Sequence, residues 1–172
     1  ANTLTIDNAA VVQTNGQAGP GGTITLSSNH DLQINQAQIS ANGSTDGGSL
    51  YITSRSGSLN LYDSLIQTNG GNGRGGSIST SANSNSITIS GALESIGATQ
   101  GGNILITANN IPLENNSSIT ATGNAGGGTV LVGGDWQGSN GVYQATTVIM
   151  RPGAAIDASA LINGDGGKVL LW

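Results

Sequence analysis

The chain contains no cysteine and no phenylalanine, and only 8% of its 172 residues are charged. Without cysteine there can be neither a disulfide framework nor a thiolate zinc site. His30 is the only histidine, so no histidine-based triad and no zinc site can be built around it, and we expect it in an exposed turn. Most of the common catalytic and metal-binding constellations are therefore excluded.

Positive charge is also scarce, with 4 Lys and Arg against 9 Asp and Glu, for a net charge of −5. A chain without a basic patch is a poor partner for nucleic acid or for an anionic membrane. No apolar run reaches the length of about 18 residues that a transmembrane helix needs. An acidic, cysteine-free chain rich in Gly, Asn, Ser and Thr is typical of an extracellular repeat protein, so we expect an extracellular location.

A Gly-Gly pair followed by alternating apolar and polar residues recurs along the whole chain. The first glycines of these pairs, at positions 21, 47, 75, 101, 127 and 166, are 26, 28, 26, 26 and 39 residues apart. A fixed period of this length indicates one supersecondary unit stacked on copies of itself. Although the low apolar content would also allow disorder, the regular placement of the apolar residues favours a folded solenoid.

Each repeat holds three short segments with alternating apolar residues, separated by Gly, Asn or Ser. The predicted inward pairs of the first segment are Ile24/Leu26, Leu50/Ile52, Ile78/Thr80, Ile104/Ile106, Val130/Val132 and Val169/Leu171. Those of the second are Leu4/Ile6, Leu32/Ile34, Leu59/Leu61, Ile87/Ile89, Ile111/Leu113 and Val148/Met150. Those of the third are Val12/Thr14, Ile39/Ala41, Ile66/Thr68, Leu93/Ser95, Ile119/Ala121 and Ile156/Ala158, whose small second members predict a tight corner.

These features predict an all-β fold, a right-handed parallel β-helix of about six coils, each with three short strands and about 26 residues. A left-handed β-helix would show a hexapeptide period, which is missing. We expect residues 1–172 to form a single domain, the glycines to provide corners with positive φ, and equivalent asparagines to bond along the axis. Pro112 has no N–H for the ladder, so we expect a local distortion near it.

The last Gly-Gly interval is about 13 residues longer than the others (39 against 26), which predicts an inserted loop at about 133–146. Insertions in solenoids often form the binding face. Outward positions of the first segment change from polar residues early in the chain to leucine later, and the loop carries aromatic residues. The loop could cover these leucines, contact a partner or a neighbouring coil, or bind sugar. The candidate interface patch consists of Leu105, Leu131, Trp136, Tyr143, Leu170 and Trp172.

The acidic residues are mostly isolated along the chain. Glu94 and Asp157 share an outward column two coils apart, about 10 Å by strand spacing, and the usual glycosidase needs a carboxylate pair. Since the residue between them is the unremarkable Thr120, a solvated face is the simpler interpretation. The stretch 163–167 has a weak similarity to a calcium-binding nonapeptide, but that motif works in tandem, so a single copy is weak evidence for a site. We therefore expect no catalytic residue, no bound metal and no cofactor, and we expect that the protein is not an enzyme.

The C-terminal third resembles the filamentous-haemagglutinin-like large exoproteins of bacteria. The resemblance rests on three stretches, Gly127 to Gly138 with its Gly-Gly-Asp-Trp-Gln-Gly string, Ala155 to Ala160, and Asn163 to Trp172. It implies a secreted right-handed β-helix shaft at the bacterial cell surface that is used in adhesion, with no catalytic residues.

The leading hypothesis is thus a structural or adhesive extracellular rod, and the alternative is a carbohydrate-binding or carbohydrate-active β-helix. The chain starts in a second segment and ends in a first segment, so a further copy could continue the helix in register. We expect end-to-end contacts with other copies or with flanking coils of a longer solenoid. A host-cell, matrix or glycan receptor is the other expected partner.

Overall fold

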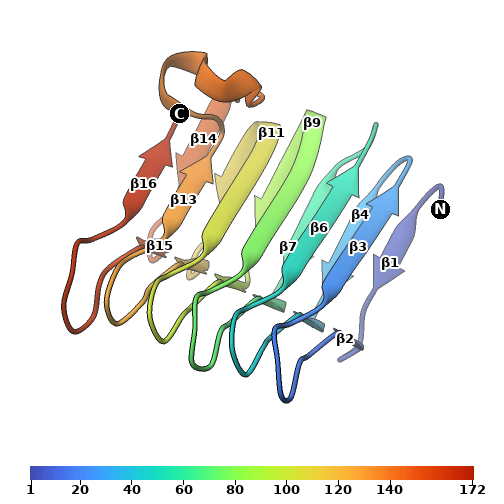
Figure 1. The fold of residues 1–172 in the computed structure, drawn as a ribbon. Helices are drawn as coiled ribbons and strands as arrows, with labels where there is room; N and C mark the ends of the chain where they lie inside the picture. The colour runs from blue at the N-terminus through green and yellow to red at the C-terminus, as the bar shows by residue number, and fades with distance from the viewer.

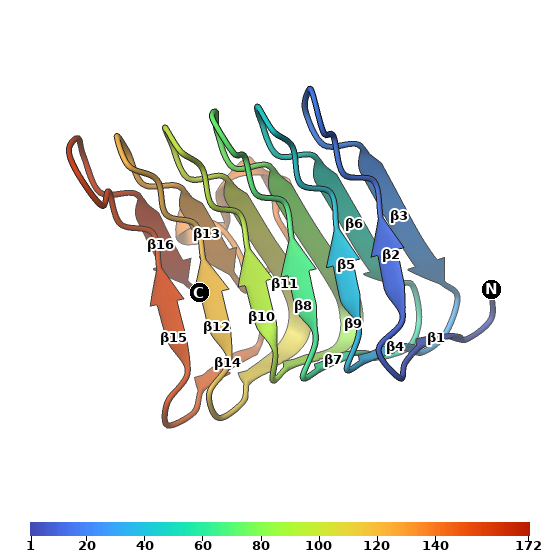
Figure 2. The ribbon, with the colours of Figure 1, turned by 90° about the horizontal axis from the view of Figure 1, so that it is seen from below.

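The chain forms an all-β parallel solenoid in a computed structural model that describes residues 1–172 (Figure 1). Successive coils lie side by side along one axis, and each coil adds one strand to each of three parallel ladders (Figure 2). The only helical element is the short 3-10 segment η1 (Trp136–Gly141). No helix has the length and apolar character needed to cross a membrane.

The first ladder contains β3 (Thr23–Ser28), β6 (Ser49–Ser54), β9 (Ser77–Ile89), β11 (Asn103–Leu113), β13 (Thr129–Val132) and β16 (Lys168–Leu171). The second contains β1 (Leu4–Ile6), β4 (Leu32–Asn35), β7 (Leu59–Tyr62), the later parts of β9 and β11, and β14 (Thr147–Met150). The third contains β2 (Val11–Gln13), β5 (Gln38–Ser40), β8 (Leu65–Gln67), β10 (Ala92–Glu94), β12 (Ser118–Thr120) and β15 (Ala155–Asp157). The predicted alignment of all three segments is confirmed by this pairing.

The predicted number of coils was slightly too high. Each ladder has six strands joined by five pairing steps, so the chain completes about five turns of about 27 residues. The remainder of the chain is the incomplete turn that carries β15 and β16.

The first and second ladders merge into one sheet because β9 and β11 run through the corner between them. At the same corner of the earlier coils, Ser28 and Ser54 donate their hydroxyl hydrogens to the backbone oxygen of His30. The equivalent residues of β9 and β11 are Ala82 and Ala108, which pair with each other and have no such hydroxyl. A serine hydroxyl that bonds the local backbone competes with ladder pairing, so its absence accounts for the continuous strands. The pairing of β11 with β9 shifts between Ala108 and Asn110, which is a local distortion of the strand that contains Pro112.

The core is a stack of like residues on like residues. It comprises 26 buried apolar side chains, and central members such as Ile39, Ile66 and Leu93 are fully buried. Each such aliphatic side chain stabilises the fold by about 1.5–3 kcal/mol relative to an exposed one. The stack is open at the terminal coils, where the inward residues Val169 and Leu171 are each 43% exposed.

The Gly-Gly pairs lie at the corner before the first ladder. The predicted positive φ is found at turn glycines such as Gly153 (φ 81°) and Gly164 (φ 86°), but the prediction was wrong for the Gly-Gly pairs. None of the glycines in these pairs has a positive φ. A Cβ added to Gly47 would instead lie 2.0 Å from the backbone oxygen of Thr68 in the next coil, and one added to Gly101 would lie 2.0 Å from that of Ala121. At these two corners glycine is therefore required by the close approach of two backbones, whereas a Cβ at Gly166, in the last pair, would meet no atom within 4 Å.

The predicted asparagine ladder is present at the corner that follows the third ladder. The side-chain oxygen of Asn15 accepts a hydrogen bond from the backbone N–H of Asn42 at 2.8 Å, and that of Asn42 accepts one from Asn69 at 2.7 Å. The side chain of Asn69 continues the series by accepting from Ile96 at 2.8 Å. Each bond links one coil to the next, so the ladder holds the corner in register.

Candidate functional site

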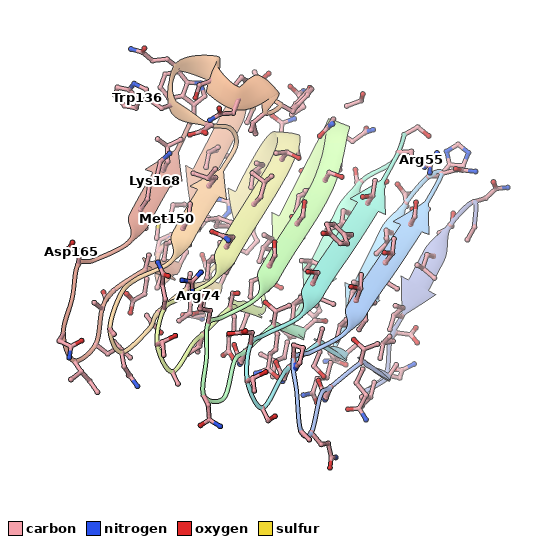
Figure 3. All side chains as sticks on the ribbon, viewed as in Figure 1. Arg55, Arg74, Trp136, Met150, Asp165 and Lys168 are labelled. Carbon is pink, nitrogen blue, oxygen red and sulfur yellow. The ribbon has the colours of Figure 1, made fainter.

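The main departure from the repeat is the loop of residues 133–146 between β13 and β14. In the preceding coil the equivalent connection is the three residues 107–109, as the pairs Ile106↔Val132 and Asn110↔Thr147 show. The loop thus adds 11 residues (14 − 3). It projects from the solenoid near the C-terminal end, and Trp136 lies in it (Figure 3).

Asp135 anchors this loop to the solenoid. One carboxylate oxygen accepts hydrogen bonds from the backbone N–H of Trp136 at 2.7 Å and from the ammonium of Lys168 at 2.8 Å. The other accepts from the side-chain amide of Asn140 at 2.7 Å. Because Asp135 is only 6% exposed, its charge depends on these partners, and Lys168 belongs to β16, which lies beside the loop.

The same hydrogen bonds, led by that from Lys168 and followed by those from Asn140 and Trp136, lower the pKa of Asp135 from 3.8 to about 2. Partial burial opposes this effect but does not outweigh it. An aspartate whose pKa is lower in the folded state stabilises the fold above its unfolded pKa. The stabilisation by Asp135 is therefore complete above about pH 4 and is lost as the pH falls through about 2.

We predict that Lys168→Met raises the pKa of Asp135 and moves the acid-induced release of the loop to higher pH. The carboxyl carbon of Asp135, followed by NMR over a pH series, reports the pKa, and Trp136 fluorescence reports the loop. The control is Arg151→Met, which breaks the exposed ion pair between Arg151 and Glu114, 2.9 Å apart. An unchanged Asp135 titration in Lys168→Met would contradict this account of the anchor.

Two tryptophans meet beside this anchor. The ring centroids of Trp136 and Trp172 are 6.0 Å apart with the planes tilted by 60°, an arrangement that favours aromatic pairing. Both rings are largely open to solvent, at 59% for Trp136 and 44% for Trp172. Tyr143, also in the loop, is 37% exposed. The aromatic members of the predicted patch therefore lie on the loop and on the end of the strand that the loop contacts.

The leucines of the predicted patch form one outward row on the first ladder. Leu105 pairs with Leu131, and Leu131 pairs with Leu170. The outward residues on either side of Leu170 are Lys168, in β16, and Trp172, which follows β16, and both contact the loop. All three leucines are half-buried although they face outward, and the contacts of Lys168 and Trp172 bring the loop beside the Leu170 end of the row. The structure thus joins the loop to the C-terminal end of the row, and Leu105 lies two coils away.

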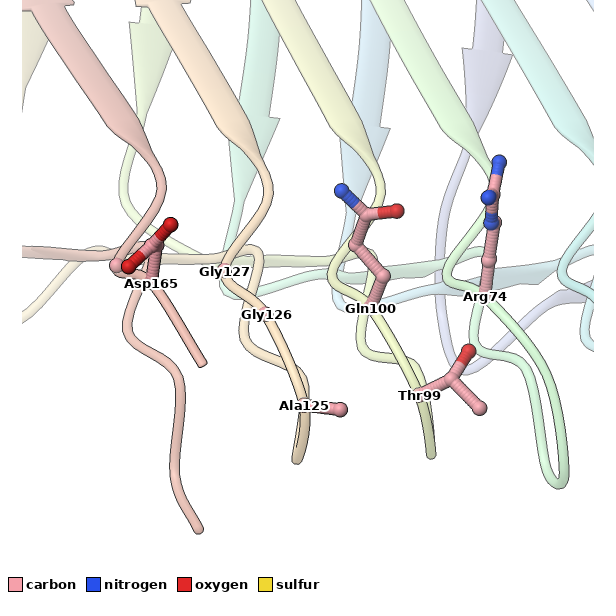
Figure 4. A pocket seen from close by; sticks show the side chains of 8 residues that line it. Arg74, Thr99, Gln100, Ala125, Gly126, Gly127 and Asp165 are labelled. Carbon is pink, nitrogen blue, oxygen red and sulfur yellow. The ribbon is translucent and has the colours of Figure 1, made fainter. Parts of the chain in front are cut away.

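A second feature is a notch of about 430 Å³ in the row of loops that precede the first ladder (Figure 4). Arg74, Gln100, Gly126 and Asp165 occupy equivalent positions, since each backbone oxygen accepts from the first glycine of the preceding coil. The notch opens where Gly126 has no side chain. The periodic pattern of apolar residues gave no signal for this notch. Arg74 and Asp165 stand three coils apart, about 14 Å by strand spacing, and so do not pair.

The outward acids of the third ladder are structurally engaged. Glu94 and Asp157 are indeed two pairing steps apart, through Thr120. Glu94 accepts hydrogen bonds from the side-chain amides of Gln67 at 2.7 Å and Asn69 at 3.3 Å. No group of three or more His, Asp or Glu side chains is gathered closely enough to hold a metal ion.

No family model matches this chain, and no curated protein or solved structure is significantly similar to it. Its class, a parallel β-solenoid built from a repeated coil, follows from the strand pairing alone. The fold is compatible with the adhesin shaft that the C-terminal motifs predict, and membership of the haemagglutinin-like family stays a prediction from those motifs.

Proposed function

We propose that this chain is a structural rod of a bacterial surface or secreted filamentous adhesin, and that it stacks end to end with further coils. The observation that supports this best is the open core at the terminal coils. At the C-terminal end Met150, Val169 and Leu171 are each more than 40% exposed, although the central members of their rows are buried. Solenoids cover such edges with polar capping repeats or with further coils, because bare strand edges pair readily.

The adhesive part of the proposal is supported by the loop patch. Trp136, Tyr143 and Trp172 are partly exposed aromatic side chains, and aromatic residues are enriched where proteins bind partners. The anchor between Asp135 and Lys168 holds the loop in place. Beads coated with the purified chain should retain epithelial cells or matrix proteins, and Trp136→Ala should reduce retention. Equal retention by the variant would show that Trp136, and with it the loop patch, is not part of the adhesive surface.

We predict that the purified chain self-associates as its concentration rises and that Leu171→Lys weakens this association about tenfold or more. The lysine would introduce a charge into the edge on which the next coil packs. Sedimentation velocity measures the association, and electron microscopy shows whether the product is a rod. The control is Ile162→Lys, which changes a 75% exposed residue of the preceding loop and leaves the core edge intact. Short monomeric rods at every concentration would contradict stacking between copies.

A further inference from the structure

A shallow groove of about 250 Å³ lies on the outward face of the second ladder, on the side of the solenoid that β4 and β7 form. It is lined by Gln33, Asn35, Asn60, Leu61, Tyr62, Thr88 and Ser90. These residues come from three successive coils. Six of them belong to β4, β7 and β9, and Ser90 directly follows β9. The groove is separate from the loop of residues 133–146 and from the open ends of the core.

Two outward rows form the groove. Gln33 pairs with Asn60, and Asn60 pairs with Thr88. In the second row Asn35 pairs with Tyr62, and Ser90 occupies the next position of this row, one coil further along. Two coil spacings give the groove a length of about 10 Å along the axis. Polar side chains are thus presented at a regular spacing beside a single aromatic ring.

The amide groups of the groove are free to bind a ligand. The side chains of Gln33, Asn35 and Asn60 have no hydrogen-bond partner within the chain, although each is only partly exposed. The third ladder is different, because there the amides of Gln67 and Asn69 are engaged by Glu94. Each free amide offers two donor hydrogens and an acceptor oxygen, so the groove carries a dense, unused set of both.

Tyr62 supplies an apolar surface beside these amides. Its side chain is 55% exposed, and a tyrosine ring combines an apolar face with a polar hydroxyl. A small number of polar groups beside an aromatic face is the usual composition of a small-ligand site. The other exposed tyrosine of the same coil, Tyr51, lies on the first ladder and does not line the groove.

We propose that this groove binds an uncharged sugar unit of a neutral oligosaccharide or polysaccharide. None of the seven lining residues carries a charge, so the groove has no counterpart for an anionic sugar, a phosphate or a nucleic acid. A neutral pyranose matches both parts of the groove, since its hydroxyls pair with amides and its C–H face covers an aromatic ring. This goes beyond the proposed rod and does not depend on stacking or on the loop patch.

The test is an NMR titration of the ¹⁵N-labelled chain with cellohexaose, laminarihexaose, mannohexaose and xylohexaose, and with hexagalacturonate as the anionic comparison. We expect at least one neutral probe to shift the side-chain amides of Gln33 and Asn60 and the backbone around Tyr62. Tyr62→Ala should weaken that binding about tenfold, in keeping with the loss of about 1.4 kcal/mol of stacking. Asn60→Ala should weaken it several-fold, and Tyr62→Phe should retain most of it.

The matched control is Tyr51→Ala, which removes another exposed ring (45%, against 55% for Tyr62) from a neighbouring face and should leave binding unchanged. Circular dichroism of each variant shows that the solenoid is intact. The proposal is overturned if no neutral probe shifts the groove at millimolar concentration, or if Tyr51→Ala weakens binding as much as Tyr62→Ala. Shifts confined to the loop of residues 133–146, or stronger binding of hexagalacturonate, would overturn it as well.

Discussion

Replacing Gly75 by alanine is expected to destabilise the solenoid by about 3 kcal/mol. The added Cβ would lie 2.1 Å from the backbone oxygen of Ser95 and 2.6 Å from the backbone nitrogen of Gly102. Both atoms belong to the next coil and are joined by a 2.7 Å hydrogen bond, so neither can move without breaking a contact between the coils. Relief requires a backbone shift in the middle of the stack, where coils lie on both sides.

The effect of Gly75→Ala is measured as the midpoint of guanidinium unfolding by circular dichroism. The control is Gly19→Ala, because a Cβ at Gly19 meets no atom within 4 Å and the change should stay within about 0.5 kcal/mol. Equal midpoints for the two variants would show that the close approach of the backbones does not constrain the corner. A large loss of stability in both variants would indicate that the backbone freedom of glycine, and not the close approach of the two coils, causes the effect.

Ile66→Ala is expected to cost about 4 kcal/mol, the middle to upper part of the range for large-to-small changes in a core. Ile66 is fully buried and pairs with Ile39 on one side and Leu93 on the other. Because both neighbours are held by their own strands, the cavity cannot collapse from either side. The same midpoint measurement reports the loss.

Two comparisons define this second experiment. Ile162→Ala removes a side chain that is 75% exposed and should change stability by less than about 0.5 kcal/mol. Ile156→Ala removes the equivalent of Ile66 from the last strand of the same ladder, where the residue is only half-buried, and should cost less than Ile66→Ala. Equal losses for Ile66→Ala and Ile156→Ala would argue against a core built by stacking of neighbouring coils.

The strand register could be predicted because the repeat carries the same pattern in every coil. An inward pair such as Ile39 and Ala41 has a counterpart in each copy, and parallel stacking places equivalent residues on adjacent rungs. The outward rows that line the groove follow from the same register. The groove itself does not, because whether Gln33, Asn60 and Tyr62 surround a hollow depends on how their side chains pack.

The loop was visible in the sequence as a longer interval, but its anchor was not. Asp135 and Lys168 are separated by 33 residues, and no pattern links a lone aspartate to a lone lysine at that separation. Their contact exists because β16 lies beside β13 and the loop folds over it. The low pKa of Asp135 is likewise a property of three donors that the fold gathers around one carboxylate.

The sequence by itself determined the class of the protein, a parallel β-solenoid, together with the faces of its strands and the position of the loop. It could do so because the periods of strand and coil are local and repeat along the chain. Only the tertiary structure decided why the corners need glycine, what holds the loop and where polar side chains remain unpaired. Each of these depends on distances between coils, such as the 2.0 Å between an added Cβ at Gly47 and the oxygen of Thr68, and a linear pattern contains no such distance.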